Sequence, residues 1–561
     1  MSALASLCGF RGQRVSWKNA ASALLVWFFV TVALSGAAYA ATKPNVLFIA
    51  VDDLRPELGT YGASYIKSPN IDRLAERGVR FERAYCQYAI CGPSRASLLT
   101  GLRPDTLKIE HIDTFFRDTV RDVVTLPQYF RQNGYTTVYT GKIFHGRQTD
   151  DANSWTRPAT PAPTRASAAQ GEYQLPESRA IVEQRREDAL KRYGSTDMQG
   201  MGGGPACEAA EALDNAYPDG RTTESAIATL REIKDGPFFL GVGFLKPHLP
   251  FVAPQKYFDL YDPATLPLAE FRGAPTDAPT IARHSSFELR TRTGVPTSGP
   301  IDEATARRLM HGYAACVSFI DAQVGRLLDE LDRLGLRENT IVVFWGDHGW
   351  HLGEFGIWGK ATNHEIATRV PLIVSAPETK ARSKGARGLV ELVDVYPTLC
   401  DLAGLPLPPH LEGESFRRLL DAPELPGKPA AFSQFPSPAL REWAARPLGN
   451  AMRRTFFGPL IGEVEAQLQR EHGQRYDADI FNNHLMGYSL RVDRYRFTAW
   501  VDRRHPDAEP YAMELYDHTR DSNERENLSH RPENRLVVDE LRAKLMTFWR
   551  GEHEEERRIG R

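Results

Sequence analysis

The chain has 561 residues, of which 42% are hydrophobic and 25% are charged. This length suits two to four domains, or fewer if one is a large α/β unit, and the apolar content excludes an intrinsically disordered protein. The 69 basic and 71 acidic residues leave a formal charge of −2. A general nucleic-acid-binding protein would carry a basic excess, so we expect no nucleic-acid partner. An anionic ligand must be bound by a local cluster of cations.

The first forty residues have the pattern of a secretory signal peptide. Arg11, Arg14 and Lys18 precede an apolar run over residues 20–40, which ends in a small-x-small sequence. We expect cleavage there and an exported, periplasmic or secreted protein with no stable membrane association. The alternative is an uncleaved anchor, because the apolar run is long enough to span a bilayer.

Five continuous apolar runs predict buried strands of the type found in parallel sheets. They cover residues 45–51, 136–140, 238–244, 340–345 and 371–374. Capped patterns with apolar residues three and four apart predict helices over residues 71–77, 125–133, 221–234 and 303–335. Strands that alternate with helices indicate an α/β fold, with a mostly parallel sheet covered by helices on both faces.

Two stretches interrupt this alternation. Residues 150–220 are rich in proline and glycine, which predicts a long insertion with loops that forms a substrate wall or lid. Residues 488–493 and 495–501 alternate in polarity and predict a hairpin, followed by a helix at about 534–550. We therefore predict a signal peptide over 1–40, a catalytic domain over 41–425 and a smaller C-terminal α+β domain over 426–561.

Charged and imidazole side chains follow four of the predicted strands. In chain order they are Asp52 and Asp53, then Lys142 and His145, then Lys246 and His248, and finally Asp347 and His348 with Lys360. Ligands of open α/β sheets bind beyond the carboxyl ends of the strands. Carboxylates bind a hard divalent cation, whereas lysines and histidines bind an anion. The mixture predicts a metal-bound oxyanion, although adjacent acids at one strand end are often only a capping turn.

Cys91 precedes a predicted helix. Pro93 suits the first turn of that helix, and free N–H groups at a helix N-terminus favour an anion. A lone cysteine is usually a packing residue. After signal cleavage, however, the chain would keep an odd number of cysteines, namely Cys86, Cys91, Cys207, Cys316 and Cys400. An odd number in an oxidising compartment indicates that one of them serves chemistry.

A longer motif surrounds this cysteine. It consists of Cys91, Pro93, Ser94, Arg95, Ser97, Leu99, Thr100 and Gly101. The motif resembles the signature of the type I sulfatases, which oxidise the cysteine to formylglycine (3-oxoalanine). The segments that begin at Asp52, Lys246, Asp347, residue 390 and residue 486 resemble the iduronate-2-sulfatase-like subgroup. The resemblance covers nearly the whole mature chain and implies an alkaline-phosphatase-like fold and a formylglycine-generating enzyme as maturation partner.

The resemblance also implies a metal site and a catalytic set. The ligands of a calcium ion would be Asp52, Asp53, Cys91, Asp347 and His348. Histidine is an unusual ligand for a hard cation, which makes His348 the least typical of the five. The catalytic residues would be Cys91, Arg95, Lys142, His145, His248 and Lys360.

Each member of the catalytic set has an implied role. Arg95 would orient the nucleophile, and the lysines, with Lys246 as a further substrate-binding residue, would neutralise the sulfate. His145 would assist sulfate release, and His248 would protonate the leaving sugar oxygen.

The implied activity is exo-hydrolysis of sulfate esters in sulfated glycans, of the kind that removes the 2-O-sulfate of a terminal uronate. Asp214 and Arg221 lie in a well-matching segment, and an arginine there could bind a sugar carboxylate. Residues 108–113 depart from the subgroup's pattern, so the sugar stays open. Two alternatives also stay open: a phosphonate or phosphodiester hydrolase of the same superfamily, and a sulfated-glycan-binding protein without catalysis.

Overall fold

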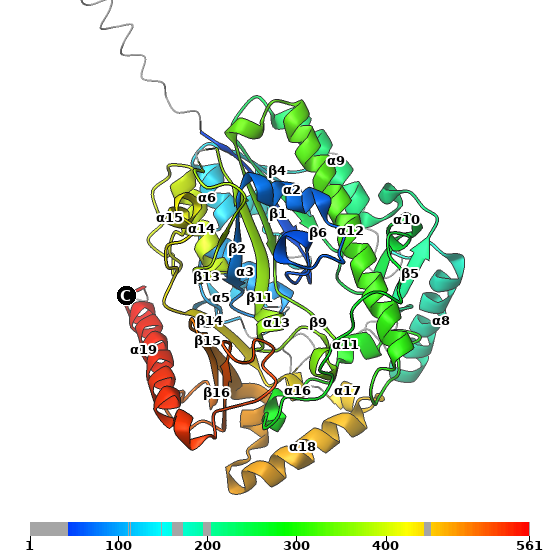
Figure 1. The fold of residues 1–561 in the computed structure, drawn as a ribbon, viewed down its shortest axis with the longest axis vertical. Coiled ribbons are helices and arrows are strands. Elements are labelled where there is room, and N and C mark those ends of the chain that lie inside the picture. Colours follow the sequence, from blue (N-terminus) through cyan, green and yellow to red (C-terminus); the bar gives the residue numbers. More distant parts are fainter. Residues whose placement is uncertain are drawn as a thin grey trace, which may run out of the picture. The chain divides into compact units, whose positions relative to one another are not determined.

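The structure is a computed structural model, which describes residues 43–109, 111–112, 114–146, 149–159, 172–194, 203–377, 379–441 and 450–559. The predicted signal peptide lies outside these residues, as do parts of the predicted insertion and of the segment 108–113. Within the described part, nine strands form the main sheet (Figure 1). Eight follow the order β12-β2-β11-β8-β1-β6-β3-β4, and β13 also pairs with β2.

The central strands of this sheet are the ones that the apolar runs predicted. They are β1 (Asn45–Val51), β3 (Thr136–Gly141), β6 (Phe238–Phe244) and β8 (Thr340–Gly346). β1 pairs in parallel with both β6 and β8, and β3 pairs in parallel with β6. The outer strands are β2 (Val79–Tyr85), β4 (Arg157–Pro158), β12 (Lys384–Ala386) and β13 (Val390–Glu391).

The predicted direction of one strand is wrong. β11 (Arg369–Ser375) contains the run predicted as parallel, but it pairs antiparallel with both of its neighbours, β8 and β2. The chain returns from β8 to β11 through loops that contain a two-stranded hairpin, a 3-10 turn and the short helix α13 (Glu365–Thr368), rather than through a crossover helix that would keep the direction. The apolar run therefore reports burial in the middle of the sheet, not parallel pairing.

Helices cover both faces of the sheet, as predicted (Figure 1). Alternate residues of β1 enter different cores, with Leu47 and Ile49 in one and Val46 and Phe48 in the other. The first core includes α2 (Pro69–Arg77), α9 (Pro218–Ile233) and α12 (Glu303–Arg333). The second includes α3 (Cys91–Thr100), α6 (Leu126–Gln132) and α14 (Val395–Leu402). The sheet is thus the middle layer of three.

A second, antiparallel sheet follows in the C-terminal part. Its order is β14 (Ala431–Pro436), β15 (Leu485–Arg491), β16 (Tyr495–Asp502) and β17 (Ala512–Asp517). β15 and β16 form the predicted hairpin, and α19 (Arg535–Ile559) packs against it through Val538 and Leu541. Residues Pro44–Arg561 form one compact unit, so the boundary at residue 425 stays a prediction.

In its described residues, the predicted insertion contains regular elements as well as loops. α8 (Pro176–Tyr193) has 18 residues, and β5 (Cys207–Ala210) pairs with β7 (Phe251–Pro254). Across the described ranges, none of the helices combines the length and the apolar character needed to cross a membrane.

Candidate active site

The parallel strands bring their carboxyl ends to one edge of the sheet. Val51 of β1 is in register with Phe244 and Gly346, the last residues of its two neighbours. The side chains that follow these strands therefore begin side by side. The backbone N–H of Asp347 donates to Val51 O at 3.2 Å and that of Asp52 to Phe244 O at 3.2 Å, which extends the alignment beyond the strands.

Two adjacent acids reach the same site because the backbone turns between them. Successive residues of a strand point to opposite faces. Asp53 leaves the strand geometry with a φ of 58°, in the left-handed region that Asp enters more easily than most residues. Its N–H donates to Asp347 Oδ1 at 3.1 Å. Both Asp52 and Asp53 are fully buried, which is costly for carboxylates unless positive charge faces them.

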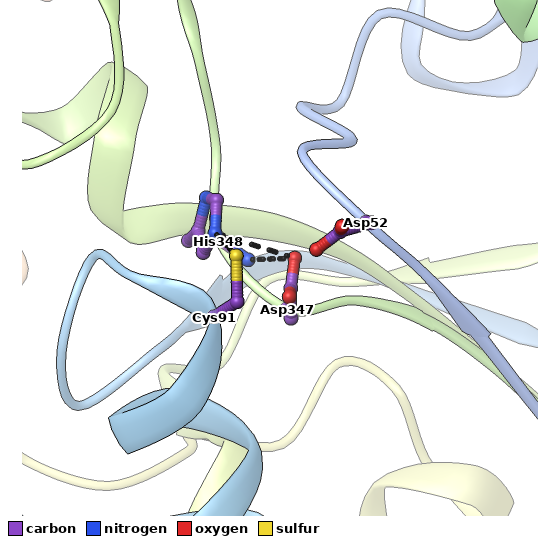
Figure 2. A group of neighbouring side chains, drawn as sticks. All are labelled: Asp52, Cys91, Asp347 and His348. Carbon is purple, nitrogen blue, oxygen red and sulfur yellow. Dashed lines mark hydrogen bonds and ion pairs between the residues drawn. The ribbon is translucent and has the colours of Figure 1, made fainter. Parts of the chain in front are cut away.

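Cys91 lies at the first residue of α3 and faces the carboxylates, as Figure 2 shows. Ser94, one turn later, donates its hydroxyl to Asp347 O at 2.5 Å, which fixes the helix against the end of β8. The Sγ atom of Cys91 lies 3.3 Å from His348 Nε2 and 3.5 Å from Lys360 Nζ. The thiol is 1% exposed, so the predicted nucleophile position is inside the site.

The predicted metal ligands come together as one group. Ligand atoms of Asp52, Cys91, Asp347 and His348 all lie within 4.8 Å of one another, and Asp52, Asp53, Cys91 and His248 form an overlapping set. In addition, Asp53 Oδ2 is buried without a hydrogen-bond partner in the described part of the chain. Three carboxylates and an orphaned carboxylate oxygen fit a hard cation such as Ca²⁺.

Buried cations neutralise the acids. Arg95 donates from Nε to Asp347 Oδ2 at 2.7 Å and lies with its NH2 group 3.5 Å from Asp52 Oδ1. Lys142 forms an ion pair with Asp52, and Lys360 donates to Asp53 Oδ1 at 2.7 Å. Each acid therefore faces a cation, which offsets much of the cost of burial.

A pocket of about 100 Å³ opens beside Cys91. It is lined by Ile90, Cys91, Ile112, His145, His248, His284, Glu288, Gly359, Lys360 and Ala361. The backbone orients the His248 ring, because its Nδ1 lies 2.7 Å from Leu249 O. The other ring nitrogen, Nε2, lies 3.4 Å from Glu288 Oε1. Sequence reasoning missed Glu288 and His284, which lie in an irregular segment without a motif.

The charges shift the pKa values in this group. Burial alone would raise the pKa of the Cys91 thiol, but Lys142, Lys360 and His348 outweigh it and lower that pKa well below its usual value. Burial raises the pKa of Asp347 to about 7. Burial would lower the pKa of His248, but the carboxylates around it, chiefly Asp53, raise it to about 9. The site thus favours a thiolate and an imidazolium.

Three predicted substrate-binding residues have their partners elsewhere. The Lys246 ammonium donates to the carbonyl oxygens of His248 and Pro250, at 2.9 and 2.8 Å, and so holds the loop that carries His248. Asp214 pairs with Lys256 at 2.7 Å, and Arg221 donates to the backbone carbonyls of Asn215 and Ala216, just before its helix. These partners give all three residues a structural explanation, so their substrate contacts stay predictions.

Comparison with known proteins identifies the family of the chain. Residues 44–405 match the family model described as Sulfatase. The chain is 34% identical over 546 residues to iduronate 2-sulfatase of Mus musculus, which covers 86% of this chain and 90% of that protein.

Two solved structures share the fold. One is a phosphonate monoester hydrolase from Silicibacter pomeroyi, with a TM-score of 0.64, 22% identity and coverage of 90% and 95% of the two chains. The other is a protein in complex with its substrate D-glucosamine-2-N,6-O-disulfate, with a TM-score of 0.66, 19% identity and coverage of 91% and 99%. They confirm the predicted architecture, and the family match and the iduronate 2-sulfatase relative show the activity class. The chain belongs to the sulfatase family and is a hydrolase of sulfuric esters.

Proposed function

We propose that this sulfatase is exported, requires calcium, and removes sulfate from the non-reducing ends of sulfated glycans, with the 2-O-sulfate of a terminal uronate as its substrate. One observation carries the proposal. The Sγ position of Cys91 lies within reach of a buried carboxylate group on one side and of Lys360 on the other. An anionic ester can be held there by metal and lysine together while it meets a nucleophile at residue 91.

Two groups complete this site. Oxidation of Cys91 by a formylglycine-generating enzyme would supply a hydrated aldehyde as the nucleophile at the helix N-terminus. A calcium ion held by Asp52, Asp53, Asp347 and His348 would supply positive charge against the sulfate and the nucleophile. The orphaned Asp53 Oδ2 and the oxygen-rich donor set support this assignment.

The chain's own residues perform the remaining tasks. Lys142 and Lys360 neutralise the sulfuryl oxygens, and their ion pairs with Asp52 and Asp53 keep both ammonium groups in place. His248 carries a proton on Nε2 toward the leaving sugar oxygen, since its Nδ1 is already engaged by Leu249 O. His145 lines the same pocket and assists sulfate release.

The substrate class rests on relatives rather than on the pocket. The similarity to mouse iduronate 2-sulfatase extends over 86% of the chain, which favours a sulfated uronate. A phosphonate ester is the second candidate, because a phosphonate monoester hydrolase has the same fold.

The test is sulfate release by the protein co-produced with a formylglycine-generating enzyme, with Cys91→Ala as the inactive control. The panel contains a disaccharide that ends in 2-O-sulfated iduronate, other sulfated sugars, and aryl phosphate and phosphonate esters. We expect sulfate release from the iduronate disaccharide. Release only from another sugar would refute the uronate assignment, and phosphonate cleavage without sulfate release would overturn the main proposal.

A further inference from the structure

Among the described residues that line the Cys91 pocket, Glu288 is the only acid, and it does not belong to the metal group. It lies on α11 (Phe287–Arg290), a short helix in the long connection before α12. Neither the metal site nor the neutralisation of a sulfate explains a carboxylate here. A negative charge in a pocket for an anionic ester weakens binding of that ester unless it serves another part of the substrate.

The position of the carboxylate identifies that part. Its Oε1 lies 3.4 Å from His248 Nε2, and its Oε2 lies 3.7 Å from Lys360 Nζ. Both distances are ion-pair contacts, and in the ranges that the structure describes the Glu288 side chain accepts no hydrogen bond. Its side chain is 21% exposed, so its lone pairs remain available to a ligand from the open side.

Two pocket walls fix where a substrate must lie. Lys360 also contacts Cys91 Sγ at 3.5 Å, so the sulfur of the ester must lie near these two groups. The sugar then lies on the His248 side, next to the proposed proton donor of the leaving oxygen. Glu288 is within ion-pair distance of this histidine, so its carboxylate lies on the side of the pocket that the sugar would occupy.

We infer that Glu288 is a specificity-determining residue, whose carboxylate accepts a hydrogen bond from a hydroxyl group adjacent to the sulfate ester and rejects a second anionic group at that position. This inference rests on the proposed function for the location of the ester. A 2-O-sulfated uronate with a free 3-hydroxyl meets the requirement, whereas a 2,3-disulfate does not. Hydrogen bonds to charged groups are the stronger ones, and like charges at close range repel.

The test uses matched substrates in which only the neighbouring group changes. Phenyl sulfate has no adjacent donor, 2-hydroxyphenyl sulfate has one, and benzene-1,2-disulfate has a second anion; the 2-O-sulfated uronate and its 3-deoxy analogue form a sugar pair. The enzyme is matured protein, either wild type or Glu288→Gln, which keeps the size of the side chain and removes the charge. Glu270→Gln, at an exposed carboxylate outside this pocket, is the control. Thermal unfolding verifies that both variants fold.

We expect Glu288→Gln to lower kcat/KM for the hydroxyl-bearing substrates about tenfold more than for phenyl sulfate, as loss of a charged hydrogen bond does. In Glu288→Gln, kcat/KM for benzene-1,2-disulfate should rise relative to kcat/KM for phenyl sulfate. An equal loss on phenyl sulfate and 2-hydroxyphenyl sulfate would overturn the inference, because it would make Glu288 a positioning residue for His248 and Lys360. Aryl turnover without any uronate turnover would refute the uronate assignment alone, and Glu288 would then be judged on the aryl pair.

Discussion

Arg95 and Asp347 form a fully buried ion pair, in which the guanidinium Nε donates to the carboxylate Oδ2 at 2.7 Å. The same guanidinium donates to the carbonyl oxygens of Lys142 and Ile143 and approaches Asp52. One side chain of α3 therefore holds the ends of β1, β3 and β8 together. The residue four positions after Cys91 fixes the cysteine's helix relative to the proposed metal ligands.

Replacement of Arg95 should damage both stability and activity. Arg95→Met leaves the buried Asp347 carboxylate without its guanidinium partner, and loss of one partner of a buried pair costs roughly 3–5 kcal/mol. Arg95→Lys keeps the charge but loses the planar fork, so we expect folded protein with strongly reduced kcat. Urea unfolding and sulfate release measure the two effects. Arg73→Met, which breaks the partly exposed pair with Asp329, should cost no more than about 1 kcal/mol; a similar loss in both variants would contradict this account.

Cys91→Ser should give a protein that reacts once and stops. A serine hydroxyl can form the sulfate ester, but it lacks the second geminal hydroxyl through which a hydrated aldehyde would expel sulfate. Intact mass spectrometry after incubation with substrate should show one added sulfuryl group per chain, and Cys91→Ala should show none. Steady turnover by Cys91→Ser would refute the need for formylglycine.

The sequence predicts the fold where side chains are buried on both sides. β1, β6 and β8 match their apolar runs to within one residue, because a central strand tolerates few polar groups. β2 escapes prediction, since Arg80, Glu82 and Arg83 interrupt its apolar pattern at partly exposed positions. The direction of β11 is not predicted for a different reason. The direction of a strand depends on the segment that connects it to the preceding strand and not on its own residues.

The sequence likewise predicts one part of the site and not the rest. Strand ends and the Cys91 motif predict residues that meet at one sheet edge, because parallel strands enforce that meeting. Glu288 could not be predicted, since a short helix in an irregular segment places it there and no spacing marks it. The orientation of Lys246 was equally hidden, because its ammonium group binds two carbonyls of its own loop.

Removal of calcium should lower both activity and thermal stability. The carboxylates that would bind the ion are buried, so folded protein binds it and unfolded protein does not. At a calcium concentration about 100 times Kd, this linkage is worth about 2.7 kcal/mol. Thermal unfolding with a chelator and with added calcium measures it, and Asp347→Asn should respond less than wild type. If chelation changes neither the unfolding temperature nor sulfate release, the metal assignment is wrong.

Gly243→Ala should displace Lys142. A Cβ atom at Gly243 would lie 2.0 Å from Lys142 O, which is backbone and cannot move aside without shifting the residue. Overpacking of this kind costs roughly 1–3 kcal/mol, and the shift should also reduce kcat/KM. Gly236→Ala is the matched control, since a Cβ there has no atom within 4 Å. Equal stability and activity of the two variants would show that the contact between β6 and Lys142 is not rigid.

Acid should weaken the link between the antiparallel sheet and the segment that follows Lys360. The Glu365 carboxylate accepts from Arg496 at 2.7 Å, from Arg491 at 3.2 Å and from the Tyr85 hydroxyl at 2.9 Å. Burial would raise the pKa of Glu365, but the two arginines outweigh it and lower the pKa from 4.5 to about 2.

A pKa that folding lowers means that the unfolded chain binds the proton more tightly. The stabilisation by Glu365 is therefore fully present above pH 4.5 and is lost as the pH falls to about 2, and its full size is about 3 kcal/mol. Glu365→Gln should be less stable than wild type at about pH 6, and this difference should shrink toward about pH 3. Urea unfolding of both proteins at the two pH values measures the difference. A constant difference would mean that the arginines do not hold Glu365 ionised, and the charge pairing between β15, β16 and α13 would then contribute little to stability.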